Sequence, residues 1–136
     1  MLIWRKIMNN QEQILQVVEN YKKVIHSQNK EDFYKLWSKQ QCRLISITKT
    51  FIGLDQIYQE FLINCIQAAY QKIDLMSEDI QINLINDELA VVIFQYHTEC
   101  IKRDTGEDYG IQGLETQVMI KENDEWKLLH VHYSKA

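Results

Sequence analysis

Two histidines near the end of the chain, His130 and His132, have a spacing that suggests chemistry. They lie two positions apart in "EWKLLHVHYS", a stretch typical of a β-strand, so both side chains are expected on one face. A zinc site needs three or four converging ligands, and His97 or Glu99 is the available third. Because no further ligand motif accompanies them, we predict no metal site and no cofactor. We interpret the pair as hydrogen-bonded histidines on the outer face of a strand.

A second group of candidates combines one carboxylate with tyrosines. Alternation along the strands places Glu115 on the same face as Gln117, and Tyr96 on the same face as Thr98, with Tyr133 on the last strand. A carboxylate shielded from water can act as a base near neutral pH, and a tyrosine hydroxyl can stabilise a developing oxyanion. The same side chains could instead form a satisfied polar network in the core. Residue types alone leave both interpretations open.

The elements that must position these residues change from helical to β along the chain. Asn10 and Gln13 resemble a capping box, and an apolar stripe at helical spacing follows them. A short helix capped by Asn29 comes next, and a third helix is predicted from Gly53 to about residue 70. Alternating apolar residues then predict strands over 42–48, 79–86, 89–102, 109–122 and 126–134. Helices followed by a meander of antiparallel strands predict an α+β domain.

Size and charge limit the class of protein. The 136 residues suit one domain spanning 1–136, and the formal net charge is −4. No run of Lys or Arg is present, so we expect no nucleic-acid or anionic-lipid partner. No segment has the roughly 20 apolar residues of a membrane span, and the start, "MLIWRKIMNNQEQ", lacks the apolar run of a signal peptide.

The three cysteines, Cys42, Cys65 and Cys100, are far apart in the sequence. Their number and spacing fit neither a disulfide framework nor paired metal ligands. We therefore expect a reducing, cytoplasmic location in which each behaves as a small, buried hydrophobic residue.

Three stretches together resemble a known family: "FIGLDQIYQEF", "NDELAVVIFQYHT" and "GLETQVMIKENDEWKLLHVHYS". They are similar to the nuclear transport factor 2-like superfamily, and within it to the SnoaL-like branch close to the association domain of calcium/calmodulin-dependent kinases. That branch ends in a Glu-Thr strand, a charged turn, a Trp and a His-x-His-x-Ser strand. The resemblance covers the chain from about Asp32 onward. The superfamily contains isomerases, cyclases, dehydratases and assembly domains, so function must be argued from the site.

The resemblance implies a cone-shaped α+β fold, with N-terminal helices packed on a strongly curved antiparallel sheet that encloses a pocket. Arginines line this pocket in the kinase-association branch, and the corresponding positions here are Tyr96, Gln117 and Tyr133. The resemblance therefore implies that these three side chains face inward. Without arginines, the pocket suits a neutral or cationic ligand. The candidate pocket residues are Tyr96, Thr98, Glu115, Gln117, Tyr133 and Trp37, of which Trp37 would either stack on a ligand or belong to the core.

The opposite, convex face of the sheet is more apolar than a water-covered face should be. We therefore predict a homodimer through this face, which is also the habit of the superfamily. The predicted interface residues are Val91, Ile93, Val118, Ile120, Leu128, His130 and His132.

The sequence supports two functional hypotheses. The leading one is a stand-alone, dimeric, non-catalytic domain with room in the cone for a small neutral ligand. The alternative is a small enzyme of the polyketide cyclase, isomerase or dehydratase type, with Glu115 as base and Tyr96 or Tyr133 as donor. A cavity lined by these three residues, with Glu115 unpaired and its pKa raised, would favour the enzyme. A cavity filled by side chains, or a Glu115 held in hydrogen bonds to the backbone, would rule the enzyme out.

Overall fold

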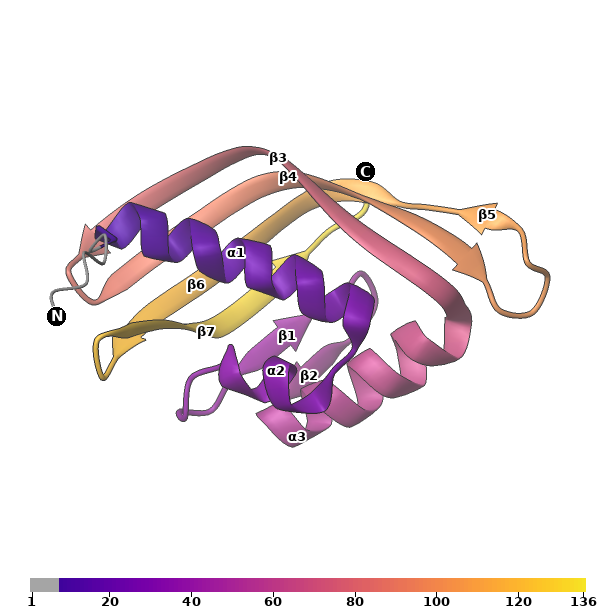
Figure 1. Cartoon of the computed structure of the whole chain (residues 1–136), viewed down its shortest axis with the longest axis horizontal. Helices are drawn as coiled ribbons and strands as arrows, with labels where there is room; N and C mark the ends of the chain where they lie inside the picture. Colours follow the sequence, from indigo (N-terminus) through magenta and orange to yellow (C-terminus); the bar gives the residue numbers. More distant parts are fainter. Residues whose placement is uncertain (1–7) are drawn as a thin grey trace, which may run out of the picture.

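The computed structural model describes residues 8–136, and the part of the signal-peptide prediction that falls on residues 1–7 lies outside them. The described chain is an α+β fold, as predicted, in which helices come first and a strongly curled sheet follows (Figure 1). Helix α1 runs along the inner side of the bent sheet, and a later helix closes the end far from the N-terminus. Among these residues no helix has the length and apolar character needed to cross a bilayer.

The first two helices begin at asparagine caps. Helix α1 spans Asn10–Ser27, and its cap is Asn9 rather than the predicted Asn10, because the Asn9 side chain accepts from the Glu12 amide at 2.8 Å. Helix α2 spans Lys30–Lys35 and is capped by Asn29 as predicted. The apolar stripe of α1 is buried against the sheet and comprises Ile14, Val17, Val18, Tyr21, Val24 and Ile25.

The third helical segment has an unusual winding. A short α-turn, α3 (Leu54–Gln56), continues into the π-helix η1 (Ile57–Gln67). The i→i+5 pattern appears at its end, where the Ala68 amide donates to the Ile63 carbonyl. The helix predicted after Gly53 is therefore confirmed, but its wider turns change which side chains face the sheet. Phe61 and Leu62 are buried here.

One seven-stranded sheet forms the rest of the fold, in the order β2-β1-β7-β6-β4-β3, with β5 paired to β4. All pairs are antiparallel except β1 with β7, which are parallel, so the predicted antiparallel sheet is wrong at this pair.

Strand β3 also begins at residue 70, well before the predicted start at 79, and β2 was not predicted. The strands are β1 (Arg43–Ile45), β2 (Thr50–Ile52), β3 (Tyr70–Asn86), β4 (Leu89–Lys102), β5 (Asp108–Tyr109), β6 (Gln112–Glu122) and β7 (Glu125–Tyr133).

A β-bulge in β7 reverses the alternation of that strand part-way along its length. Val118 pairs with His130 and Met119 pairs with Leu128, so Leu129 is an extra residue without a partner on β6. Leu128 consequently faces the core and is fully buried. Its predicted place on the convex interface is therefore wrong. The main chain of Leu128 also pairs with residues 36–38, since its amide donates to the Leu36 carbonyl and its carbonyl accepts from the Ser38 amide, each at 2.8 Å.

Candidate functional site

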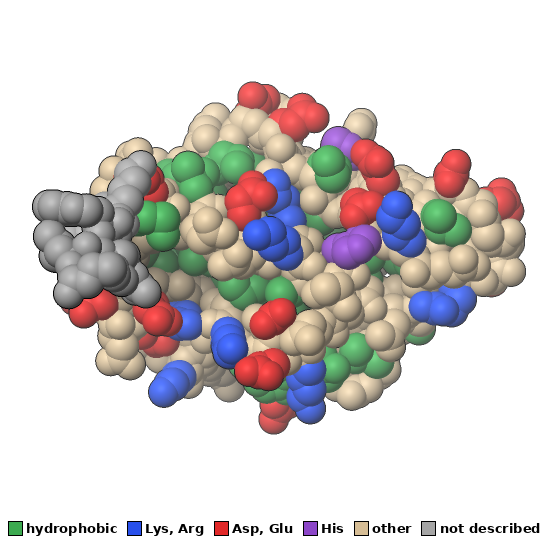
Figure 2. Space-filling view, viewed as in Figure 1, with side chains coloured by type: hydrophobic (Ala, Val, Ile, Leu, Met, Phe, Trp, Pro, Cys, Tyr) green, Lys and Arg blue, Asp and Glu red, His purple; other side chains and the backbone are tan. Residues whose placement is uncertain are grey.

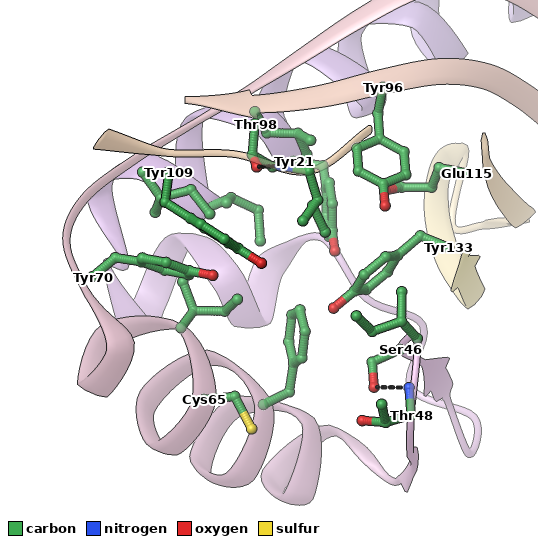
Figure 3. A pocket seen from close by; sticks show the side chains of 17 residues that line it. Tyr21, Ser46, Thr48, Cys65, Tyr70, Tyr96, Thr98, Tyr109, Glu115 and Tyr133 are labelled. Atoms are coloured by element: carbon green, nitrogen blue, oxygen red, sulfur yellow. Dashed lines mark hydrogen bonds between the residues drawn. The ribbon is translucent and has the colours of Figure 1, made fainter. Parts of the chain in front are cut away.

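A cavity of about 220 Å³ lies between α1, η1 and the concave face of the sheet. Seventeen residues line it, and five of them are tyrosines (Figure 3). Among these lining residues Glu115 is the one acidic side chain, and none is Lys, Arg or His. The curled sheet and the helices therefore enclose a small, phenol-rich space around one carboxyl group.

Four of the six predicted pocket residues line this cavity, namely Tyr96, Thr98, Glu115 and Tyr133. Their shared orientation follows from alternation: even-numbered residues of β4 and odd-numbered residues of β6 are the buried ones. Gln117 lies on the same face as Glu115 but is fully buried beyond the cavity wall. The structure thus brings four candidates to the cavity and places a fifth directly behind them.

Trp37 does not line the cavity. It is only 3% exposed and packs against Phe33 at a ring-centroid distance of 5.7 Å. Its backbone forms an isolated parallel bridge with Leu128, so the ring belongs to the core between α2 and β7. The interpretation of Trp37 as a pocket residue is wrong, and its alternative reading as a core residue is confirmed.

Glu115 is a buried carboxyl group that faces the cavity. Its side chain is 2% exposed, and burial raises its pKa from the usual 4.5 to about 7. A hydrogen bond from Gln117 Nε2 to Glu115 Oε2, at 2.7 Å, acts in the opposite direction and favours the carboxylate. A carboxyl group with a pKa of about 7 is half ionised near neutral pH. This protonation behaviour suits a general base or a general acid.

Tyr96 and Tyr133 pack edge to face beside this carboxyl group, with ring centroids 5.8 Å apart and planes at 85°. The Tyr96 hydroxyl donates to the main-chain carbonyl of Ser134 at 2.8 Å. Burial raises the pKa of Tyr96 to about 12, with the negative charge of Glu115 adding to the effect. Burial likewise raises the pKa of Tyr133, helped by Tyr96 and Glu115. Both phenols are therefore protonated at neutral pH, so each carries a hydroxyl hydrogen that can be donated.

Tyr21, on the apolar stripe of α1, is a site residue that was not among the predicted pocket residues. It is 1% exposed, yet its hydroxyl end lines the cavity and is directed toward the region of Tyr133 (Figure 3). Burial raises its pKa well above the usual value, and Glu115 and Tyr133 raise it further. A tyrosine among Ile and Val on a core stripe was the available signal, because a buried phenol needs a polar partner.

The outer part of the cavity is aromatic and apolar. Tyr70 and Tyr109 stack there with centroids 6.1 Å apart and planes at 18°, on the side of the cavity away from Glu115 (Figure 3). The exposed lining residues, which mark the solvent side, are Ile47, Thr48, Cys65 and Tyr109. The expectation that Cys65 is buried is therefore wrong. Sequence reasoning missed Tyr70 on β3, Tyr109 on β5 and Ile47 after β1 because these residues are far apart in the chain and meet only in the tertiary structure.

The remaining predicted residues lie on the outer face of the sheet. Val91, Val118 and Ile120 are half-buried, and Ile93 is 40% exposed. His130 and His132 are also on β7 outside the cavity, and burial lowers the pKa of His130, with His132 and Arg43 adding to the effect. His97 instead contacts Glu99 at 3.1 Å, on β4. In the described chain no three His, Cys, Asp or Glu side chains converge as metal ligands.

Basic and acidic side chains are mixed on the face that carries α1, and neither sign forms a continuous region there (Figure 2). The cavity lining has one carboxyl group and no Lys, Arg or His, so it does not favour an anionic ligand.

The fold of this chain is similar to the folds of several solved structures. No curated protein matches the sequence significantly. A nuclear transport factor 2-like superfamily protein of Salmonella enterica serovar Typhimurium is similar in structure, with 25% identity, a TM-score of 0.84, and 90% of this chain and 87% of that chain covered.

Two further structures share the fold at lower identity. The hexachlorocyclohexane dehydrochlorinase LinA-type3 of Novosphingobium barchaimii has 8% identity and a TM-score of 0.81, with 92% and 85% covered. A Xanthomonas campestris protein, provisionally named a calcium/calmodulin-dependent protein kinase II association domain, has 15% identity and a TM-score of 0.79, with 95% and 89% covered. The sequence profile of the SnoaL-like domain matches residues 14–136. The chain therefore belongs to the SnoaL-like domain family of the nuclear transport factor 2-like superfamily.

Proposed function

We propose that the protein is a small acid–base enzyme that removes a carbon-bound proton from an uncharged substrate. The observation that carries this proposal is the buried Glu115 carboxyl, which faces an open cavity and has its pKa raised to about 7. A structural glutamate in a core is normally paired with a cation, whereas no Lys, Arg or His lines this cavity. Of the two hypotheses from the sequence, the enzyme is the better supported.

In the proposed reaction Glu115 accepts a proton from a carbon next to a carbonyl group. The C–H bond breaks, its electron pair forms a C=C bond, and negative charge develops on the carbonyl oxygen. Tyr133 is the donor suited to that oxygen, because no described residue accepts its hydroxyl hydrogen, whereas the Tyr96 hydroxyl already donates to Ser134. Return of the proton to another carbon gives isomerisation, and loss of a neighbouring leaving group gives elimination.

The cavity also limits the substrate. Its volume of about 220 Å³ is below the roughly 300–1,000 Å³ of pockets for drug-sized ligands, so the substrate has one ring or a chain of similar size. The apolar outer part, with Tyr70 and Tyr109, suits a hydrocarbon portion. A carboxylate or phosphate on the substrate would meet Glu115 without a compensating cation.

The proposal is tested by hydrogen exchange in D₂O. Small cyclic ketones, each paired with a carboxylate analogue, are incubated with the protein and followed by proton NMR. In the wild-type protein we expect the hydrogens next to the carbonyl group of an uncharged ketone to exchange. In Glu115→Gln this exchange should be at least about 100-fold slower. Glu88→Gln, an exposed glutamate in the turn before β4, is the matched control and should exchange at the wild-type rate. Exchange that is equal in the wild type and in Glu115→Gln would refute the proposal.

We also propose that the protein forms a homodimer through the outer face of the sheet. Support comes from the apolar residues of that face, Val91, Ile93, Val118 and Ile120, and from the adjacent His130 and His132. Leu128 is not part of this surface. The cytoplasmic location inferred from the cysteine spacing stays a prediction.

A further inference from the structure

Gln117 is a buried amide with an unusual hydrogen-bond balance. It is fully buried on β6, two residues from Glu115 and on the same face of the strand. Its Nε2 donates to Glu115 Oε2 at 2.7 Å, while its Oε1 has no hydrogen-bond partner among the described residues. Buried polar atoms are nearly always paired, so an orphaned oxygen next to a candidate base requires an explanation.

Among the described residues, Glu115 is the one side chain that forms a hydrogen bond with the Gln117 amide. Its neighbours across the sheet are Val92 on β4 and Val131 on β7, and both are fully buried. Gln117 does not line the cavity, so a ligand there does not take over its hydrogen bonds. The polar group to which this amide is hydrogen-bonded is therefore the carboxyl group of Glu115.

We propose that Gln117 is the positioning residue for Glu115 and holds its carboxyl group in both protonation states. When Glu115 is ionised, the Nε2–H of Gln117 donates to the carboxylate, as observed. When Glu115 carries the proton taken from a substrate, a half-turn of the Gln117 amide presents Oε1 to the new O–H. An amide is the side chain that can do both, because it carries one donor and one acceptor at equal distance from its last rotatable bond.

This role keeps the base aligned while its charge changes. Without the amide, a protonated Glu115 could turn toward another acceptor, and an ionised Glu115 would lose its one hydrogen bond from a described side chain. The other titratable groups that face Glu115 are Tyr21 on α1, Tyr96 on β4 and Tyr133 on β7. These phenols stay protonated near neutral pH, so the ionisation of Glu115 depends on burial and on Gln117.

The inference deepens the proposed function and rests on it, but its first test needs no substrate. The side-chain amide of Gln117 is followed by ¹H–¹⁵N NMR between pH 5 and 9, beside a ¹³C titration of the Glu115 carboxyl in the same protein. We expect the Gln117 amide signals to shift with the same midpoint as Glu115 and to stay constant in Glu115→Gln. Amide signals that do not follow the Glu115 titration would overturn the inference.

A second test uses Gln117→Met, which keeps the length of the side chain and removes both the donor and the acceptor. The matched control is Met119→Leu, the next fully buried residue on the same face of β6. We expect the Glu115 midpoint to rise by about one pH unit or more in Gln117→Met, because the charge-assisted hydrogen bond to the carboxylate is stronger than the bond to the protonated acid. The ionised fraction well below the midpoint then falls about tenfold, and the midpoint should stay in place in Met119→Leu. An unmoved midpoint in Gln117→Met would overturn the positioning role.

Activity separates this inference from the proposed function. If exchange of ketone hydrogens is found, the pH dependence of its rate should move upward in Gln117→Met by the same amount as the Glu115 midpoint. If both NMR tests succeed and no ketone exchanges, the positioning role stands and the proposed function fails. If ketones exchange but the Gln117 amide is insensitive to Glu115, the proposed function stands and the positioning role fails.

Discussion

The hydroxyl of Tyr96 donates a hydrogen bond to the main-chain carbonyl of Ser134 at 2.8 Å. This contact joins the middle of β4 to the segment after β7, across the intervening strand β6. A Cβ added at Gly113 would collide with the same carbonyl, so the glycine allows Ser134 to approach. The hydroxyl of Tyr96 therefore has a structural role. Tyr133 is left as the hydrogen-bond donor in the proposed reaction.

Replacing each tyrosine by phenylalanine should therefore give different results. We expect Tyr133→Phe to lower the exchange rate by about 100-fold, because the developing oxyanion loses its donor. Tyr96→Phe should instead destabilise the fold by about 0.5–1.5 kcal/mol, because it removes the hydrogen bond to the carbonyl of the exposed Ser134. Steady-state kinetics and urea unfolding of both variants check this assignment, which would be reversed if Tyr96→Phe gave the larger kinetic loss.

Glu115→Gln should stabilise the folded protein in a pH-dependent way. The pKa of Glu115 rises on folding from the usual 4.5 to about 7, so this carboxyl lowers the stability of the fold progressively between pH 4.5 and about pH 7, and the full cost applies above pH 7. Below pH 4.5 the carboxyl is protonated in both states and this cost disappears. We expect Glu115→Gln to raise the free energy of unfolding by about 3 kcal/mol at pH 8 relative to its effect at pH 4.

Urea unfolding at the two pH values measures this difference, with exposed Glu88→Gln as the control. An equal effect of Glu115→Gln at pH 4 and pH 8 would show that Glu115 keeps an ordinary pKa.

The catalytic rate should increase with pH. Because the base must be ionised, we expect kcat/KM to rise about tenfold per pH unit well below pH 7 and to level off above it. The tyrosines of the cavity should not cause a fall below about pH 10, because burial raises the pKa of Tyr96, Tyr133 and Tyr21. A pH–rate profile checks both the rise below pH 7 and the absence of a fall below about pH 10. A midpoint near pH 4.5 would contradict the claim that burial raises the pKa of Glu115.

A charge on the outer face of the sheet should separate the proposed dimer. Ile93→Asp places a carboxylate among Val91 and Val118, where a partner subunit would leave it unhydrated. We expect native mass spectrometry at micromolar concentration to show dimers for the wild type and monomers for Ile93→Asp. Leu15→Asp, at a similarly exposed residue of α1, is the control and should remain dimeric. A monomeric wild type would contradict the predicted interface.

Much of the site could be predicted because alternation is a local property. Side chains two residues apart on β4 or β6 share a face whatever the strand pairs with. The family resemblance implied which face is the inner one, and the inward direction of Tyr96, Glu115 and Gln117 was predicted correctly. The same reasoning failed on β7, where one extra residue at Leu129 moves Leu128 to the core. A bulge depends on the register with β6, which the residues of β7 do not reveal.

The sequence by itself determined the fold class, the SnoaL-like family resemblance and the strand faces around Glu115, because these depend on residue types at fixed spacing. Only the tertiary structure decided that Tyr21 reaches the cavity from α1, that Trp37 stays in the core, and that β1 joins β7 in parallel. It also decided the chemistry of Glu115. The pKa of a carboxyl group depends on how completely distant segments exclude water from it, and here those segments are α1, β4 and β7.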